Sequence, residues 1–94
     1  GGCGVISVAA NVVPAKVAGM VDAFRSGNME EARRLHFELA PLVRALFLET
    51  NPIPVKRACE LMGLAAGAPR LPLTALGKDN EKLLRSALES LKVL

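Results

Sequence analysis

The residues of this 94-residue sequence that could do chemistry are few and widely spaced. Cys3 and Cys59 stand alone, with no second cysteine or histidine at the short spacings that bind zinc. His36, the only histidine, would need a partner carboxylate and a pocket to act as a general base, so a surface histidine is the simpler interpretation. Ser7 would need an adjacent base to act as a nucleophile. We therefore expect no metal site and no catalytic residue in this chain.

Three other features have both a functional and a structural interpretation. Lys56 follows a proline turn at a predicted helix start, where it is either a desolvated reactive lysine or a surface lysine pairing with Glu60 four residues later. Cys59 falls on an apolar stripe, which favours a small core residue. One charged cluster predicts a solvated helix face, with a subunit contact as the alternative: Glu30, Glu31, Arg33 and Arg34.

Composition and charge exclude several classes of protein. Hydrophobic residues make up 51% of the chain and charged residues 22%, which is typical of one small packed domain. The chain has no Tyr and no Trp, so an aromatic platform for nucleic acid is excluded, and its net charge of +3 is spread rather than clustered. No apolar run reaches the length of about 18 residues that spans a membrane. Unpaired thiols favour a reducing, cytoplasmic location.

One short segment near the amino end has the character of a strand. Residues 5–10 form a β-branched, nearly continuous apolar run that does not alternate with polar residues. Such a run is typical of a strand buried on both faces of a parallel sheet. Three glycines mark a turn or a close backbone approach before it: Gly1, Gly2 and Gly4.

The rest of the chain predicts helices. The first helix is predicted for residues 14–26, with Pro14 in its first turn and Gly27 just beyond its end. Its apolar stripe consists of Val17, Met20, Val21 and Phe24. A second helix starts at the Asn28/Glu31 cap, contains Pro41, and stops at Asn51. Its stripe consists of Leu35, Leu39, Leu42, Leu46 and Phe47. A third helix begins at Pro54 and ends at Gly63, and a fourth covers residues 79–93. The apolar connector 64–77 should lie against the helices.

A lone buried strand is incomplete, and this shapes the interpretation of the whole chain. Unpaired backbone N–H and C=O groups are costly in an apolar setting, and the sequence contains no second strand. We therefore expect the partner strands to lie outside these 94 residues. Since the sequence also begins with Gly, we interpret it as the C-terminal piece of a larger protein.

Three phrases of the sequence carry a resemblance to a known family. They are Gly4-Val5-Ile6-Ser7-Val8-Ala9-Ala10-Asn11, Asn51-Pro52-Ile53-Pro54-Val55-Lys56 and Arg70-Leu71-Pro72-Leu73-Thr74. In this order and spacing, the chain resembles the C-terminal end of the dihydrodipicolinate synthase family. These are pyruvate-dependent class I aldolases, a group that includes N-acetylneuraminate lyase.

The resemblance implies an α/β fold, a (β/α)₈ TIM barrel with a C-terminal helical extension. Residues 1–27 would be the last βα unit of the barrel and residues 28–94 the extension, so that this chain is mostly α. The rest of the barrel would supply the missing strand partners. Barrel active sites lie at the carboxyl ends of the strands, so residues 7–11 would point toward the rim of the pocket.

The resemblance also implies a chemistry. A barrel lysine would form a Schiff base with pyruvate, which then condenses with aspartate semialdehyde in lysine and diaminopimelate biosynthesis, without a cofactor. Neither that lysine nor the family's tyrosines are present, so this chain alone should be inactive. Ile6 corresponds to a residue lining the pyruvate pocket, while Cys3 departs from the family's Gly-rich pattern. The resemblance further implies a cytoplasmic homotetramer.

Other functions remain open from the sequence. Another aldolase of the same family would share this architecture, whether N-acetylneuraminate lyase-like or specific for 2-keto-3-deoxy sugar acids. A helical oligomerisation module without catalysis is the alternative from a different class. The upstream sequence would distinguish them, since only an aldolase needs a lysine at the end of a strand.

Overall fold

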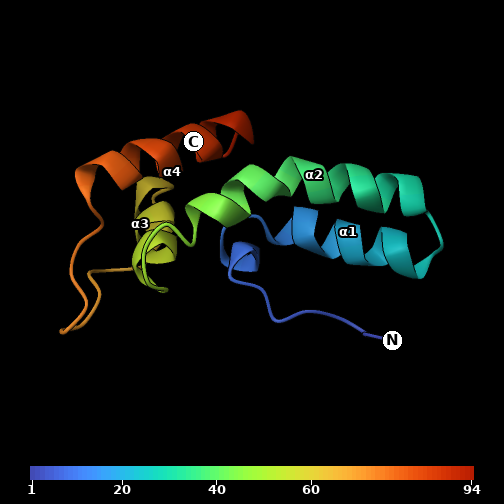
Figure 1. The fold of residues 1–94 in the computed structure, drawn as a ribbon, viewed down its shortest axis with the longest axis horizontal. Coiled ribbons are helices and arrows are strands. Elements are labelled where there is room, and N and C mark those ends of the chain that lie inside the picture. The colour runs from blue at the N-terminus through green and yellow to red at the C-terminus, as the bar shows by residue number, and fades with distance from the viewer.

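The computed structural model describes residues 1–94, and all of its regular secondary structure is helical. A short 3-10 helix, η1 (Ala9–Asn11), precedes four α-helices: α1 (Pro14–Arg25), α2 (Met29–Ala45), α3 (Ile53–Leu61) and α4 (Lys78–Ser90). Helices α1 and α2 form an antiparallel pair, and α3 and α4 lie around the carboxyl end of α2 (Figure 1). The molecule is elongated, with extents of 43 × 25 × 21 Å. None of its helices combines the length and apolar character needed to cross a membrane.

Glycines end the first and third helices, as the sequence predicts. Gly27 has a φ of +81°, and its N–H donates to the Phe24 carbonyl at 3.0 Å. The next N–H, that of Asn28, donates to Ala23 at 2.8 Å. This pair of bonds satisfies carbonyls that the helix end would otherwise leave open, and it requires a left-handed residue that glycine adopts without strain. Gly63 ends α3 in the same way, with a φ of +75°.

The start of α2 is also confirmed. The Asn28 side chain accepts a hydrogen bond from the Glu31 N–H at 3.2 Å, which satisfies one of the free donors of the first turn. Pro41 lies inside α2, as expected. The helix ends at Ala45, however, several residues before the predicted stop at Asn51.

The core runs through all four helices. Sixteen buried residues from Ala9 to Leu91 form one cluster. Its largest fully buried hydrophobic side chains come from α2 and α4 or just beyond their ends: Leu42, Leu46, Leu84 and Leu88. The predicted buried side of the last helix is thereby confirmed. This continuous cluster explains why the helices hold together without a sheet.

Two phenylalanines assigned to the apolar stripes are exposed, which corrects the prediction. Phe47 lies in the turn after α2 and points outward, whereas its neighbour Leu46 in the same turn is fully buried. Phe24 lies in the last turn of α1, where no other element of the chain covers it. The two phenylalanines are therefore apolar residues that nothing within these 94 residues buries.

The predicted strand at residues 5–10 is wrong for this chain. Residues 1–7 have no regular secondary structure, and none of them makes a backbone–backbone hydrogen bond. Ala9 and Ala10 belong to η1, where the Ser7 hydroxyl accepts from the Ala10 N–H at 3.2 Å. The physical reason is that a strand exists only as part of a ladder, and the structure contains no second strand. Val5 and Ile6 are consequently exposed rather than buried on both faces.

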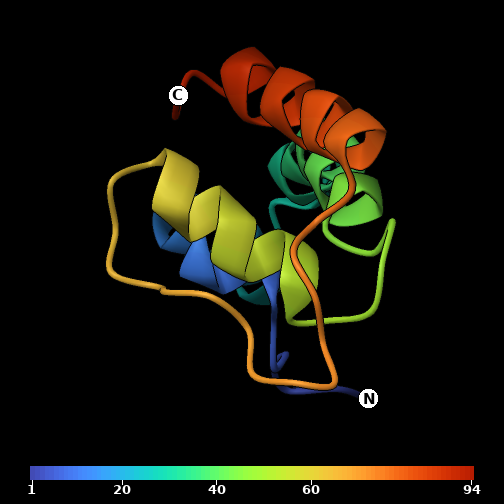
Figure 2. The ribbon, with the colours of Figure 1, turned by 90° about the vertical axis from the view of Figure 1, so that its left-hand side faces the viewer.

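The connector between α3 and α4 lies only partly against the helices. Leu76 is buried, and Leu73 packs against the core cluster. Leu71, by contrast, projects almost fully into solvent. Figure 2 shows this long loop running outside α3 before it enters α4.

Candidate functional site

Two of the three resemblance-carrying phrases meet in space, although about 40 residues separate them in the chain. η1, at the end of the first phrase, contacts α3, which the second phrase begins. The Cys59 thiol lies 3.8 Å from the Asn11 carbonyl oxygen across this contact. Beside it is a groove of about 450 Å³. Its lining includes Val8, Asn11, Asn51, Pro52, Val55, Lys56, Cys59, Ala65 and Ala66.

The polar side chains of this groove, which we call the η1–α3 groove, are two amides, an ammonium and a thiol. None of the lining residues is a carboxylate or an imidazole. The groove can therefore donate hydrogen bonds to a carboxylate or carbonyl group, but it contains none of the carboxylates or imidazoles that most often act as general acids and bases. The sequence analysis missed Asn11 and Asn51 as candidates. The available signal was their position at the inner ends of the two quoted phrases.

Lys56 is neither a free surface lysine nor a partner of Glu60. Its Nζ donates to the Ala66 carbonyl at 2.5 Å, which ties α3 to the following loop. Glu60 instead pairs with Arg57 at 2.7 Å. The predicted i,i+4 pair is thus wrong, because a loop carbonyl ten residues away competes for the ammonium.

Arg57 links α3 to α4. Its Nε and Nη2 donate to the two carboxylate oxygens of Glu81 at 3.0 and 2.8 Å, a bidentate arrangement. These bonds lower the pKa of the Glu81 carboxyl below its ordinary value. The Arg57–Glu81 pair therefore holds α3 and α4 together, on either side of the loop formed by residues 62–77.

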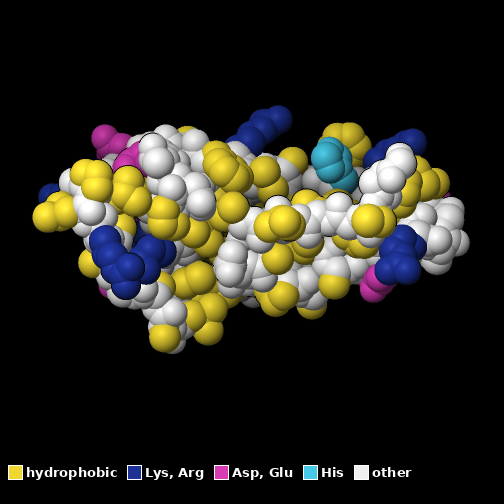
Figure 3. Space-filling model, turned by 90° about the horizontal axis from the view of Figure 1, so that it is seen from below, with side chains coloured by type: hydrophobic (Ala, Val, Ile, Leu, Met, Phe, Trp, Pro, Cys, Tyr) yellow, Lys and Arg dark blue, Asp and Glu magenta, His cyan; other side chains and the backbone are white.

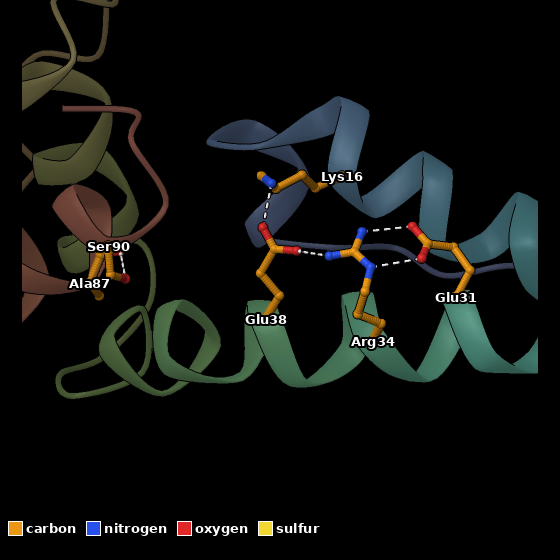
Figure 4. A network of polar contacts seen from close by, with 6 residues as sticks. All are labelled: Lys16, Glu31, Arg34, Glu38, Ala87 and Ser90. Carbon is orange, nitrogen blue, oxygen red and sulfur yellow. Dashed lines mark hydrogen bonds and ion pairs between the residues drawn. The ribbon is translucent and has the colours of Figure 1, made fainter.

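The charged cluster of α2 is part of an interhelical network. Arg34 donates to both oxygens of Glu31, at 2.6 and 2.7 Å, and to Glu38 at 2.8 Å (Figure 4). Glu38 also binds Lys16 of α1. The bond from Lys16 is the main cause of a lowered pKa at Glu38, and the bonds from Arg34 lower the pKa of Glu31. The cluster was predicted to be a solvated helix face, but through Glu38 and Lys16 it also joins α2 to α1.

Glu49 is a second residue that sequence reasoning missed. One carboxylate oxygen, Oε1, accepts from the Gly77 N–H at 2.9 Å and from the Asn80 side chain at 2.8 Å. The bond from Asn80, followed by that from Gly77, lowers the pKa of Glu49. Gly77 is the N-cap residue of α4, so Glu49 joins the segment after α2 to the first turn of α4 and places a negative charge at the amino end of that helix.

The remaining candidate residues take structural positions. His36 is exposed and meets the ring of Phe37 edge-on, with centroids 5.3 Å apart. Cys59 is half-buried against the core, as predicted, and Cys3 is exposed. No three His, Cys, Asp or Glu side chains gather in a way that could hold a metal ion. Ile6, the residue expected at a pyruvate pocket, lies on the exposed segment before η1.

The model of the dihydrodipicolinate synthetase family matches residues 1–91 of this chain. The chain belongs to this family. A curated relative, the 4-hydroxy-tetrahydrodipicolinate synthase of Methanosarcina mazei, is 61% identical over all 94 residues, which are 32% of the relative's length. The resemblance that the three phrases carry is thereby confirmed.

Solved structures of the family agree in three dimensions. The dihydrodipicolinate synthase of Thermotoga maritima superposes with a TM-score of 0.96 and 46% identity, covering 100% of this chain and 32% of that protein. A second, the chloride-inhibited enzyme of Acinetobacter baumannii complexed with pyruvate, gives a TM-score of 0.89 and 37% identity over 95% of this chain and 31% of that protein.

The chain thus spans about a third of the length of the family members it matches. Those proteins are TIM barrels, and this chain corresponds to a helical C-terminal piece of them. The fold class implied by the resemblance is confirmed at that level. The trace of residues 1–7 is included in the match to the T. maritima enzyme, since that match covers the whole chain.

Proposed function

We propose that this chain is the C-terminal portion of a 4-hydroxy-tetrahydrodipicolinate synthase, a lyase of lysine and diaminopimelate biosynthesis. The observation that carries the proposal is the 61% sequence identity with the M. mazei synthase, which extends over the entire chain. The complete enzyme would condense pyruvate with aspartate semialdehyde. A synthase that is itself complexed with pyruvate supports pyruvate as one substrate.

The proposed chemistry proceeds through a Schiff base. The amine of a barrel lysine adds to the ketone of pyruvate and water leaves, which gives an iminium. The iminium acidifies the pyruvate methyl group, and loss of one proton yields an enamine. The enamine carbon then attacks the aldehyde of aspartate semialdehyde. Lys56 is not suited to the first step here, because its ammonium is engaged with the Ala66 carbonyl.

The part that this chain would play is to complete the pocket rather than to react. Residues 1–27 would be the last βα unit of the barrel and residues 28–94 the helical extension. Barrel sites form at the carboxyl ends of the strands. If the first segment is a barrel strand, η1 follows its carboxyl end and lies beside the site. On this reasoning Ile6 lines the pyruvate pocket, and the amides of the η1–α3 groove face its rim. The enzyme would act in the cytoplasm as a homotetramer, without a cofactor.

No observation favours the alternatives over this proposal. An N-acetylneuraminate lyase-like enzyme or a 2-keto-3-deoxy-sugar-acid aldolase would share the Schiff base but act on a different aldehyde. A non-catalytic helical module would share the helices but not the match of the first segment to the family. Only the synthase proposal uses both the first segment and the named relatives.

A chimera tests the proposed function directly. The preceding two thirds of the M. mazei synthase are joined to this chain, and the product is incubated with pyruvate and borohydride, which reduces the iminium to a stable amine. We expect one adduct, on a lysine upstream of this chain, and condensation activity with aspartate semialdehyde.

The isolated chain is the matched control for that experiment. It should form no specific adduct with pyruvate, because it lacks the reactive lysine. Efficient labelling of Lys56 in the isolated chain would overturn the assignment of roles. A folded chimera without activity toward aspartate semialdehyde would overturn the proposed substrate.

A further inference from the structure

The connector between α3 and α4 is held to the rest of the molecule very unequally. Its carboxyl half is anchored by apolar contacts, because Leu76 is buried and Leu73 packs against the core cluster. Its amino half, residues 65–70, contains no buried residue. At this end of the molecule, on the left of Figure 3, basic side chains lie among apolar ones on the surface. The amino half of the connector therefore depends on polar contacts for its position.

A single hydrogen bond supplies that polar contact. It runs from the Nζ of Lys56 on α3 to the Ala66 carbonyl at 2.5 Å, and no other hydrogen bond joins residues 65–76 to the rest of the molecule. The two carboxylates nearest in the fold, Glu60 and Glu81, are both occupied by Arg57. The Lys56 ammonium takes part in no ion pair, so the connector carbonyl is its one acceptor within this chain.

The same bond forms a wall between two hollows. On one side is the η1–α3 groove, whose lining includes Ala65 and Ala66. On the other side is a hollow of about 310 Å³ between α3, the connector and α4. Lys56 is the one residue that lines both. Its bond to Ala66 therefore closes the η1–α3 groove toward α4, and loss of the bond would join the groove to the second hollow.

We propose that Lys56 is a positioning residue for the second substrate: by holding the Ala66 carbonyl it keeps the η1–α3 groove closed toward α4 and so sets the fit of the groove to a carboxylate-bearing aldehyde. This inference rests on the proposed function, which puts the groove at the rim of the pocket. The ammonium acts through the connector and touches neither the substrate nor the Schiff base. Its loss therefore weakens binding of the aldehyde and leaves the chemical step unchanged.

Nuclear magnetic resonance on the 94-residue chain tests whether Lys56 holds the connector. In the original chain the backbone order parameters of residues 65–68 should be about 0.8, and in Lys56→Met they should fall below about 0.6. Lys56→Arg keeps a charged donor and should restore most of the order. Lys82→Met is the matched control, because Lys82 lies on α4 and pairs only with the exposed Asp79. Unchanged order parameters in Lys56→Met, with the amides of α3 and α4 still in their native positions, would overturn the proposal.

Steady-state kinetics of the chimera with the M. mazei synthase test the consequence for the substrate. Lys56→Met should raise the KM for aspartate semialdehyde about 10-fold, while kcat and the KM for pyruvate stay within about 2-fold. Lys56→Arg should recover most of the affinity, and Lys82→Met should leave all three constants unchanged. A loss of kcat with an unchanged KM for the aldehyde would contradict the assigned role.

The two measurements together separate the positioning role from direct contact. A rise in the KM for the aldehyde without any loss of order in residues 65–68 would overturn the proposal, because the ammonium would then act on the substrate itself. A chimera that condenses the two substrates but is indifferent to Lys56→Met refutes this inference alone. A folded chimera that does not condense them refutes the proposed function, and this inference with it.

Discussion

The helical body and the amino-terminal segment contain the same kinds of residue but differ completely in burial. In the body, four leucines of α2 and α4 or their flanks are fully buried, and the helices contain 33 of the 54 backbone–backbone hydrogen bonds. In residues 1–7, Val5 and Ile6 are exposed and no backbone bond forms. A helix satisfies its backbone from within, whereas a strand depends on its neighbours. Apolar character in the sequence therefore becomes burial only where the chain also supplies the partner.

The largest effect expected from this contrast comes from truncating one apolar side chain in each region. Leu88→Ala should lower the free energy of unfolding by about 2–5 kcal/mol, because it opens a cavity in the core. Ile6→Ala should change it by less than about 0.5 kcal/mol, because Ile6 has no neighbours to lose. Urea unfolding followed by circular dichroism measures both. Equal losses would show that the segment packs against the body.

A smaller effect is expected at the start of α2. Asn28→Ala removes the side-chain oxygen that accepts from the Glu31 N–H, which should cost about 1 kcal/mol of unfolding free energy. Asn28→Ser keeps a capping oxygen and should stay close to the original stability. If both variants lose the same amount in urea unfolding, the cap does not account for the effect.

The end of α4 offers a stabilising change. Lys92 has a φ of +56°, and its N–H donates to the Glu89 carbonyl at 2.9 Å, so a Cβ-bearing residue holds a left-handed position. Lys92→Gly removes that strain and should raise the free energy of unfolding by about 0.5–1 kcal/mol. Lys92→Ala keeps the Cβ and should bring no gain. A gain with alanine instead would point to the lysine charge rather than the backbone.

The smallest effect concerns acid, and it belongs to the body alone because residues 1–7 carry no carboxyl side chain. Ion pairs and hydrogen bonds lower the pKa values of Glu31, Glu38, Glu49 and Glu81 in the folded chain. Their contribution is fully present above the unfolded carboxyl pKa of about 4.3 and is lost as pH falls through the lower folded values.

Melting temperatures measured between about pH 7 and pH 3 check this dependence. Tm should be nearly constant down to about pH 5 and should decline below it. The double variant Glu38→Gln/Glu81→Gln should show a shallower decline, because it removes two of the paired carboxyls. A Tm that rises as the pH falls below 4 would contradict the sign of the shifts.

Much of the helical body could be predicted from the sequence because its signals are local. The Asn28 cap, the glycines at 27 and 63 and the leucine spacing of α4 each depend on residues within one or two turns. Phe24 and Phe47 satisfied the same periodicity and were misplaced. The spacing of apolar residues shows which of them share one face of a helix, but only the neighbouring elements decide whether that face is buried.

The contacts that the sequence could not predict are long-range or belong to irregular backbone. The bond from the Gly77 N–H to Glu49 spans 28 residues, and the bond of Lys56 to Ala66 involves a loop carbonyl, which carries no sequence signature. The η1–α3 groove could be located only through the phrases shared with a family. The strand predicted for residues 5–10 is absent because these residues have the composition of a strand but the chain contains no second strand to pair with them.

Native-state hydrogen exchange on the isolated 94-residue chain tests the central claim most directly. The amides of Leu84 and Leu88 should exchange only through global unfolding, while the amides of residues 2–7 should exchange as fast as in an unstructured peptide. Protection of residues 2–7 comparable to that of α4 would contradict the claim that these residues depend on other polypeptide for their structure.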